Sequence, residues 1–144
     1  MATAAANTIH VDIVSAEGEI FSGAASMVFA PGTQGELGIA PRHAPLLTLL
    51  KAGEVRVQTP DGQEQQFFVG GGALEVQPNK VSVLADTALR AKDLDEQAAL
   101  AAKQRAEEAL HDGDDKMTHA EALKEIVRAT EQLKMIQKLR KVKG

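Results

Sequence analysis

The chain has 144 residues, of which 44% are hydrophobic, 25% are charged and only 3% are aromatic. This length fits one or two small domains. Twenty acidic residues outnumber sixteen basic ones, so the net charge of -4 provides no overall positive field to attract nucleic acid or an anionic membrane. There is no cysteine, which excludes disulfides, thiolate zinc sites and thiol nucleophiles.

Neither a secretory signal nor a membrane span is expected. The first nine residues contain no Lys or Arg and no long apolar core. The longest apolar stretch, residues 45–50, is far shorter than the roughly 20 residues needed to cross a bilayer. We therefore expect a cytoplasmic protein whose association with any membrane is through partners.

The composition changes near residue 87. All five prolines and ten of the twelve glycines precede that point. Residues 1–86 hold nine acidic and four basic residues, net -5, whereas residues 87–144 hold eleven and twelve, net +1. Because glycine and proline mark turns, we expect two differently built domains, 1–86 and 87–144.

The first domain has the alternation of apolar and polar residues that is typical of strands. Residues 9–13 and 54–58 alternate in this way, and Asp61-Gly62 indicates a hairpin turn. Further short apolar runs lie at 27–30, 46–50, 66–69, 73–76 and 81–85. Short strands with frequent turns favour an antiparallel β-sandwich over a parallel sheet, which would need helices between its strands.

Residues 31–50, PGTQGELGIAPRHAPLLTLL, form the most unusual segment of the first domain. Its glycines and prolines predict a loop that exposes Glu36, Arg42 and His43. On residue chemistry alone, this loop is either a rigid contact surface or an ordinary connection.

The second domain changes to helical periodicity. Asp93 and Glu96 predict a capping box, followed by a helix through Leu110 without glycine, proline or β-branched residues. Its apolar face is expected to be Leu94, Ala98, Ala101, Ala102, Ala106 and Ala109. Alanine contributes little transfer free energy, so this helix is expected to dock weakly.

A second helix is predicted after the polar segment 111–117. Thr118 and Glu121 form another capping box. Apolar residues then recur at helical spacing, at Leu123, Ile126, Val127, Thr130, Leu133 and Ile136. Because the connection is short, the two helices are expected to form an antiparallel hairpin.

Motifs of common catalytic or metal sites are absent from the sequence. It contains no phosphate-binding loop with a lysine, no nucleophile elbow and no His-Glu-x-x-His pair. The four histidines, His10, His43, His111 and His119, are scattered, so no metal site is expected. Gly70–Gly72 fits a turn or bulge between strands better than a phosphate cradle, because no lysine or helix start follows it. An enzyme assembled from distant Ser, His and Asp residues remains an alternative that no motif supports.

Four motifs resemble one family. They are VSAEGEIFSG at 14–23, GELGIAPRHAPLLT at 35–48, GGGALEVQPNKVSVLADTA at 70–88 and DLDE at 93–96. In this order they resemble the epsilon subunit of bacterial F-type ATP synthase. The resemblance implies a β-sandwich followed by a helical hairpin, in a non-catalytic subunit of the rotor's central stalk.

The resemblance also implies partners and a location. The sandwich of that family binds the gamma subunit and the polar loops of the c-ring, which couples proton flow to ATP synthesis. The hairpin docks on the sandwich or extends toward the alpha and beta subunits, where it inhibits ATP hydrolysis. The complex would hold the chain at the cytoplasmic face of the bacterial cell membrane.

The family's motifs assign roles to particular residues. Glu36 in GELG and His43 in the following stretch are expected at the c-ring and gamma surface, with Arg42 beside them. The C-terminal segment 134–144 has five bases and no acid, more than helix capping requires. These bases favour an acidic partner, and the resemblance supplies one in an acidic segment of the beta subunit. The residues expected to contact it are Arg128, Lys134, Lys138 and Arg140.

Some relatives bind ATP through an Ile/Leu-Asp-x-x-Arg-Ala motif with a further arginine two turns later. Here Asp95 and Arg105 match, but Ala98 replaces the central arginine, which removes a bidentate phosphate donor. Asp95 is then a first-turn acid and Arg105 a surface charge, and we expect weak or absent ATP binding. The alternative to a rotor subunit is a two-domain adaptor protein unrelated to the synthase.

Overall fold

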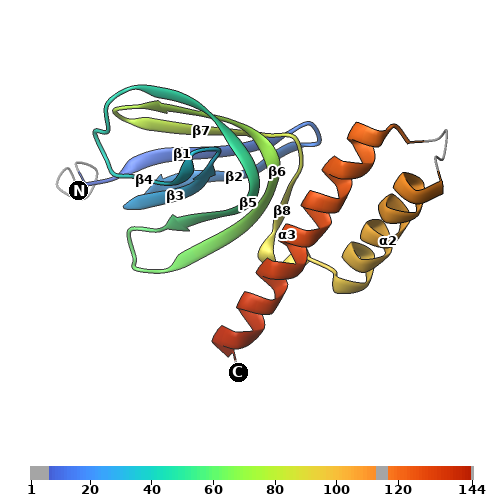
Figure 1. Cartoon of the computed structure of the whole chain (residues 1–144). Coiled ribbons are helices and arrows are strands. Elements are labelled where there is room, and N and C mark those ends of the chain that lie inside the picture. Colours follow the sequence, from blue (N-terminus) through green and yellow to red (C-terminus); the bar gives the residue numbers. More distant parts are fainter. Residues whose placement is uncertain (1–6, 113–116, 144) are drawn as a thin grey trace. The chain divides into compact units, whose positions relative to one another are not determined.

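The computed structural model describes residues 7–112 and 117–143. The protein divides into two compact units, residues 1–91 and 92–144, with the strands in the first unit and the two long helices in the second (Figure 1). The sheet continues past residue 86, because strand β8 (Ala88–Arg90) pairs with strand β6 and buries Ala88 in the core.

The described part of the first unit, from residue 7 onward, forms one sheet of eight strands. They are β1 (Ile9–Ser15), β2 (Gly18–Ala25), β3 (Met27–Gly32), β4 (Gly35–Ile39), β5 (Leu46–Gln58), β6 (Glu64–Gln77), β7 (Lys80–Ala85) and β8. The order is β2-β1-β7-β6-β5-β3-β4, with β8 added beside β6. The prediction of an antiparallel sheet is correct for most pairs and wrong for one, since β1 and β7 are parallel. Strands β2 to β6 form the long crossover that a parallel pair requires.

All eight strands contribute to a single hydrophobic core. Edge strands β2 and β4 supply Ala25 and Ile39 to the same cluster, which also contains Phe67 from the centre of the sheet. A flat sheet cannot bring both of its edges to one cluster, so the sheet folds over into two layers. The predicted β-sandwich is confirmed.

Two strands are longer than the sequence predicted. β5 and β6 each run unbroken through glycine-containing segments, and their turn contains the predicted Asp61-Gly62. Gly70–Gly72 therefore lies inside β6 rather than in a phosphate-binding loop or a turn. Only glycine fits at Gly72, because its φ is +138° and a Cβ there would lie 2.1 Å from the carbonyl oxygen of Leu84.

Residues 31–50 are mostly strand, so the predicted loop is wrong over much of its length. β4 occupies 35–39, and only residues 40–45 connect β4 to β5. Leu37 packs against the core and Ile39 is buried within it. Their alternation with Glu36 and Gly38 is the strand signal that the glycines and prolines obscured.

The second unit contains η1 (Ala91–Asp93), α2 (Glu96–Asp112) and α3 (His119–Lys143). The predicted cap at Asp93 is wrong. Asp95 caps α2, since its Oδ1 accepts hydrogen bonds from the N–H groups of Gln97 and Ala98 at 3.0 and 3.3 Å. The cap at Thr118 is confirmed, because its Oγ1 accepts a hydrogen bond from the Glu121 N–H at 3.1 Å.

The helices pack as the predicted antiparallel hairpin, but on narrower faces than expected. Their buried cluster consists of Ala106, Ala109 and Ala122, with Leu110, Met117 and Ile126 packed against it. Ala98 and Ala101 are exposed, as are Leu123 and Val127, so these members of the predicted faces are wrong. Small alanines let the two backbones approach closely, and Leu123 and Val127 lie on the exposed side of α3. Part of the predicted connection, residues 113–116, lies outside the described residues.

Candidate partner-binding surfaces

An exposed apolar row crosses the outer face of four adjacent strands. Val14, Leu84, Ala73 and Leu49 are register partners in turn, on β1, β7, β6 and β5. Leu49 and Leu84 are 65% and 51% exposed, and Leu47, beside this row on β5, is 74% exposed. Leucines in a row at this exposure are typical of a protein-binding surface. Sequence reasoning missed the row, although residues 46–50, LLTLL, carried a signal. A strand with one buried face needs only alternate apolar residues, and here leucines stand on both faces.

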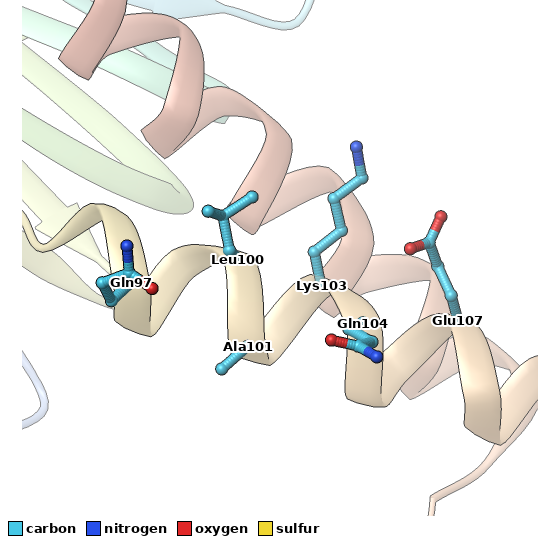
Figure 2. A pocket seen from close by; sticks show the side chains of 6 residues that line it. All are labelled: Gln97, Leu100, Ala101, Lys103, Gln104 and Glu107. Carbon is cyan, nitrogen blue, oxygen red and sulfur yellow. The ribbon is translucent and has the colours of Figure 1, made fainter.

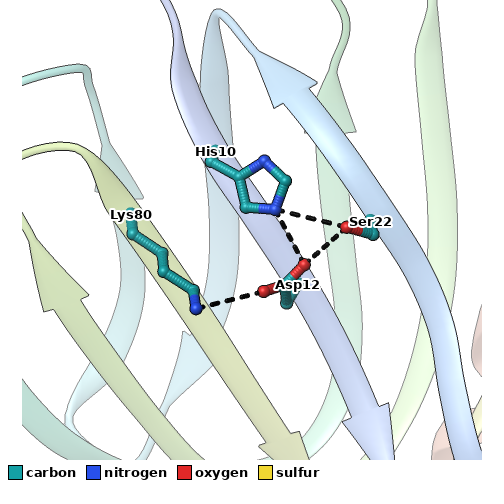
Figure 3. A network of polar contacts seen from close by, with 4 residues as sticks. All are labelled: His10, Asp12, Ser22 and Lys80. Carbon is teal, nitrogen blue, oxygen red and sulfur yellow. Dashed lines mark hydrogen bonds and ion pairs between the residues drawn. The ribbon is translucent and has the colours of Figure 1, made fainter.

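A polar network occupies the same outer face on β1 and β7 and continues onto β2 (Figure 3). The Ser22 hydroxyl donates to Asp12 Oδ1 at 2.7 Å, His10 Nε2 lies 2.9 Å from the same oxygen, and Lys80 Nζ lies 3.3 Å from Oδ2. The hydrogen bond from Ser22 lowers the pKa of Asp12 most, and the contacts of His10 and Lys80 lower it further. The carboxylate is therefore stabilised in its charged form.

This network contains Ser, His and Asp but lacks the geometry of a hydrolytic triad. Ser22 and Asp12 both contact the same imidazole nitrogen, His10 Nε2, at 3.2 and 2.9 Å. A triad needs the nucleophile on one ring nitrogen and the carboxylate on the other, so that a proton is accepted on one side while the ring is held on the opposite side. The network instead links three strands at the surface. Among the described residues, no cluster of three or more histidines and carboxylates is placed to hold a metal ion.

Glu36 lies in a charged cluster on the outer face of β4, β3, β5 and β6. The Arg56 guanidinium donates to Glu36 at 3.1 Å and lies 3.7 Å from both Glu54 and Glu64. It also lies 4.4 Å from the ring centre of Phe29, which is cation–π geometry. Three carboxylates around one guanidinium give the cluster a net charge of -2, and Glu36 is its most exposed member at 56%. Sequence reasoning did not identify Arg56, whose partners come from three other segments of the chain.

Arg42 and His43 lie in the 40–45 connection, away from the strand that carries Glu36. The Arg42 N–H donates to the carbonyl of Pro78 at 2.8 Å, which ties the connection to the β6–β7 turn. Arg42 has a φ of +65° and an exposed side chain. His43 is half-buried rather than exposed, and its Nδ1 lies 2.7 Å from the carbonyl oxygen of Ala44. The predicted trio is therefore divided between a strand and a connection.

The two residues of the predicted nucleotide motif have different surroundings. Asp95 uses Oδ1 to cap α2, as described above, and Arg105 is exposed ten residues later, about 15 Å along the helix. A shallow groove lies on α2 and extends from Gln97 to Glu107 (Figure 2). It is lined by Gln97, Leu100, Ala101, Lys103, Gln104 and Glu107. All of these belong to one helix, and their charges cancel, so the groove lacks the cluster of cations that a triphosphate favours.

Three basic residues of α3 lie near carboxylates of the same unit. Arg128 lies 3.9 Å from Glu125, and Lys134 lies 3.4 Å from Glu131; both pairs are within α3. Lys138 is exposed. Arg140 differs, because its Nη1 lies 2.9 Å from Oε2 of Glu96 on α2.

Similarity to known proteins identifies the family. Residues 8–91 match the family model of the ATP synthase Delta/Epsilon chain β-sandwich domain, and residues 92–137 match that of its long α-helix domain. The ATP synthase epsilon chain of Nitrosococcus oceani is 63% identical over 139 residues, which cover 96% of this chain and 99% of that one. The chain belongs to the ATP synthase epsilon family.

A second relative agrees with this assignment, and one solved structure shares the fold. The ATP synthase epsilon chain of Halorhodospira halophila is 55% identical over 137 residues, covering 94% of this chain and 96% of that one. A chain of the Euglena gracilis mitochondrial ATP synthase, solved with OSCP, F1 and c-ring, shares the fold at a TM-score of 0.67 and 17% identity, over 96% of this chain and 82% of that one. The resemblance seen in the sequence is confirmed, and an adaptor unrelated to the synthase is excluded.

As an epsilon subunit, the chain is a non-catalytic component of the central stalk of ATP synthase. Across the described residues, no helix is both long and apolar enough to cross a membrane. Four surfaces are candidates for binding protein partners: the apolar row, the Glu36–Arg56 cluster, the 40–45 connection and the basic end of α3.

Proposed function

We propose that the sandwich links the gamma subunit to the c-ring and that the helical hairpin inhibits ATP hydrolysis. The observation that carries the first part is the apolar row across β5, β6, β7 and β1. An apolar row of this exposure gains free energy when a partner covers it, at roughly 25 cal/mol for each Å² removed from water. We assign this row to the gamma subunit, together with the 40–45 connection that precedes β5 and carries Arg42 and His43.

The Glu36–Arg56 cluster is the proposed contact with the polar loops of the c-ring. Its net negative charge and the exposure of Glu36 suit a polar, partly cationic surface. The Euglena neighbour was solved in an assembly that includes a c-ring, which supports the c-ring as a partner, while the assignment to this cluster rests on its charge and exposure. Through these contacts the complex would hold the chain at the membrane surface and pass rotation driven by protons to the gamma subunit.

The inhibitory role is assigned to the helical unit. Its interface is built from alanines, so the helices separate at modest cost in free energy. Arg128, Lys134, Lys138 and Arg140 give α3 a basic end, which suits an acidic segment of the beta subunit. The hairpin would then act as a brake with two positions of similar free energy.

The full chain and a chain ending at Ala91 separate the two roles. Each is added to cognate catalytic core depleted of epsilon, and co-sedimentation and ATP hydrolysis are measured. We expect both forms to bind and only the full chain to suppress hydrolysis. Truncation after Ala91 keeps β8, whose Ala88 belongs to the core.

A double substitution tests the apolar row itself. Leu49→Gln with Leu84→Gln should weaken co-sedimentation with the core about tenfold or more, because two exposed leucines lose their apolar contacts. Leu100→Gln, at a similarly exposed leucine on α2, is the matched control and should bind normally. Equal binding of the double variant and the control would contradict the assignment of the row to gamma.

A further inference from the structure

The two helices of the hairpin are joined by an ion pair at the end opposite to their connection. Arg140 is close to the C-terminus of α3, and Glu96 is the first residue of α2. Their charged atoms are 2.9 Å apart, and the side chains are 63% and 31% exposed. The alanine cluster at Ala106, Ala109 and Ala122 lies nearer the connection. Toward the open end the helices bury Ala99, Met135 and Ile136. The ion pair joins the helices beyond these buried side chains, at the end where no chain connection holds them together.

The Arg140 contact also differs from two other ion pairs of α3. Arg128 and Lys134 contact Glu125 and Glu131 on their own helix, so these pairs persist when α3 leaves α2. The contact of Arg140 with Glu96 is lost by the same movement. Its charge is compensated by Glu96 when the helices are together and is released when they part.

We propose that Glu96 is an internal competitor for Arg140: it occupies this guanidinium in the closed hairpin and must be displaced before Arg140 engages a carboxylate on a partner subunit. The proposal rests on the inhibitory function proposed above and adds its regulation. Glu96 imitates the acidic partner, so the contact that closes the hairpin also masks part of the surface that inhibits.

Two substitutions should have the same effect on hydrogen exchange but opposite effects on the inhibition of ATP hydrolysis. Glu96→Gln and Arg140→Gln both remove the pair, so each should speed amide hydrogen exchange in residues 137–141 of the isolated full chain about two- to fivefold, the range for an exposed ion pair. In the reconstituted core, Glu96→Gln should inhibit hydrolysis at a two- to fivefold lower concentration, because Arg140 is unmasked. Arg140→Gln should require a higher concentration, because the partner's carboxylate loses its cation.

Two further variants serve as controls. Glu108→Gln removes the same charge from α2 at an exposed residue that contacts Gln104 on its own helix, and should change neither exchange nor inhibition. Glu96→Asp keeps a negative charge at the start of α2 but shortens the side chain by one methylene, so it should behave as Glu96→Gln does. If Glu96→Asp behaves as wild type, the charge at the helix start matters rather than the pair, and the proposal is overturned.

The outcomes separate this proposal from the function on which it rests. Absence of inhibition by the wild-type chain would contradict the proposed inhibitory function and, with it, the competition. Inhibition by wild type with shifts in the same direction for Glu96→Gln and Arg140→Gln would overturn the competition alone. Unchanged exchange in both variants would show that the pair does not close the hairpin.

Discussion

The sandwich and the helical hairpin are stabilised by different kinds of contact. The sandwich buries isoleucine, valine, leucine and phenylalanine from six of its eight described strands, and each such side chain contributes about 1.5–3 kcal/mol when fully buried. The hairpin buries mainly alanine and adds exposed ion pairs, which are worth about 0–1 kcal/mol each. We infer that one chain combines a fixed platform for binding with a helical element that rearranges at low cost.

Loss of a large core side chain should produce the largest effect and should act on the sandwich. Phe67 is 1% exposed, so Phe67→Ala is expected to lower the free energy of unfolding of this unit by about 3–5 kcal/mol. Urea unfolding followed by the signal of the sheet measures the change. Leu123→Ala, at an exposed leucine of α3, is the control and should change it by less than about 0.5 kcal/mol. If both variants lowered the free energy of unfolding by a similar amount, the large core side chains would not be what stabilises the sandwich.

An overpacked alanine should damage the hairpin selectively. Ala106 is fully buried in the contact between α2 and α3, so Ala106→Leu should destabilise that contact by about 1–3 kcal/mol. Amide hydrogen exchange in both helices should accelerate, while exchange in β6 and β7 stays the same. Ala101→Leu adds the same side chain at an exposed position and should have little effect. Faster exchange in the sheet as well would mean that the two units unfold together.

The start of α2 gives a smaller, local effect. Asp95→Ala removes the cap and should destabilise the helix by about 1 kcal/mol, which shows as faster exchange at Gln97 and Ala98. Asp93→Ala is a matched control, because Asp93 lies in η1 and the sequence pattern favoured it as the cap. If Asp93→Ala had the larger effect, the capping geometry described here would be incorrect.

The polar network on the sheet is expected to give the smallest effect. The pKa of Asp12 is lowered in the folded chain, chiefly by the Ser22 hydroxyl, so the folded state releases this proton more readily than the unfolded state does. The resulting stabilisation is present above the ordinary aspartate pKa of about 4 and is lost as pH falls through the lower folded value. Urea midpoints between pH 5 and pH 2 should therefore fall less steeply for Asp12→Asn than for wild type. Identical slopes would show that the network does not stabilise the charged carboxylate.

Much of the fold could be predicted because each half has its own periodicity. Alternation identified the sheet, and the spacing of alanine and leucine identified two helices. The parallel pairing of β1 with β7 has no local signal, since it joins residues about 70 positions apart. β5 and β6 were divided in the prediction because glycine usually marks a turn, whereas here it lets β6 pass close to the backbone of Leu84.

The functional surfaces were less predictable than the fold. Family motifs pointed to Glu36 and His43, but Arg56 and the apolar row are defined by pairing between distant strands. Likewise, the basic end of α3 was visible in the sequence, while the contact between Arg140 and Glu96 depends on how the hairpin closes. Which charges meet across two elements is decided by packing, not by spacing along one segment.

Amide hydrogen exchange across the whole wild-type chain tests the contrast between the two units most directly. Because the hairpin buries mainly alanine, we expect α2 and α3 to exchange through an opening of lower free energy, while β6 and β7 exchange only when the sandwich unfolds. Adding low concentrations of urea should therefore leave the two sets of rates separate. A single set of rates, shared by the helices and the central strands, would show that the chain unfolds as one unit and would contradict the account.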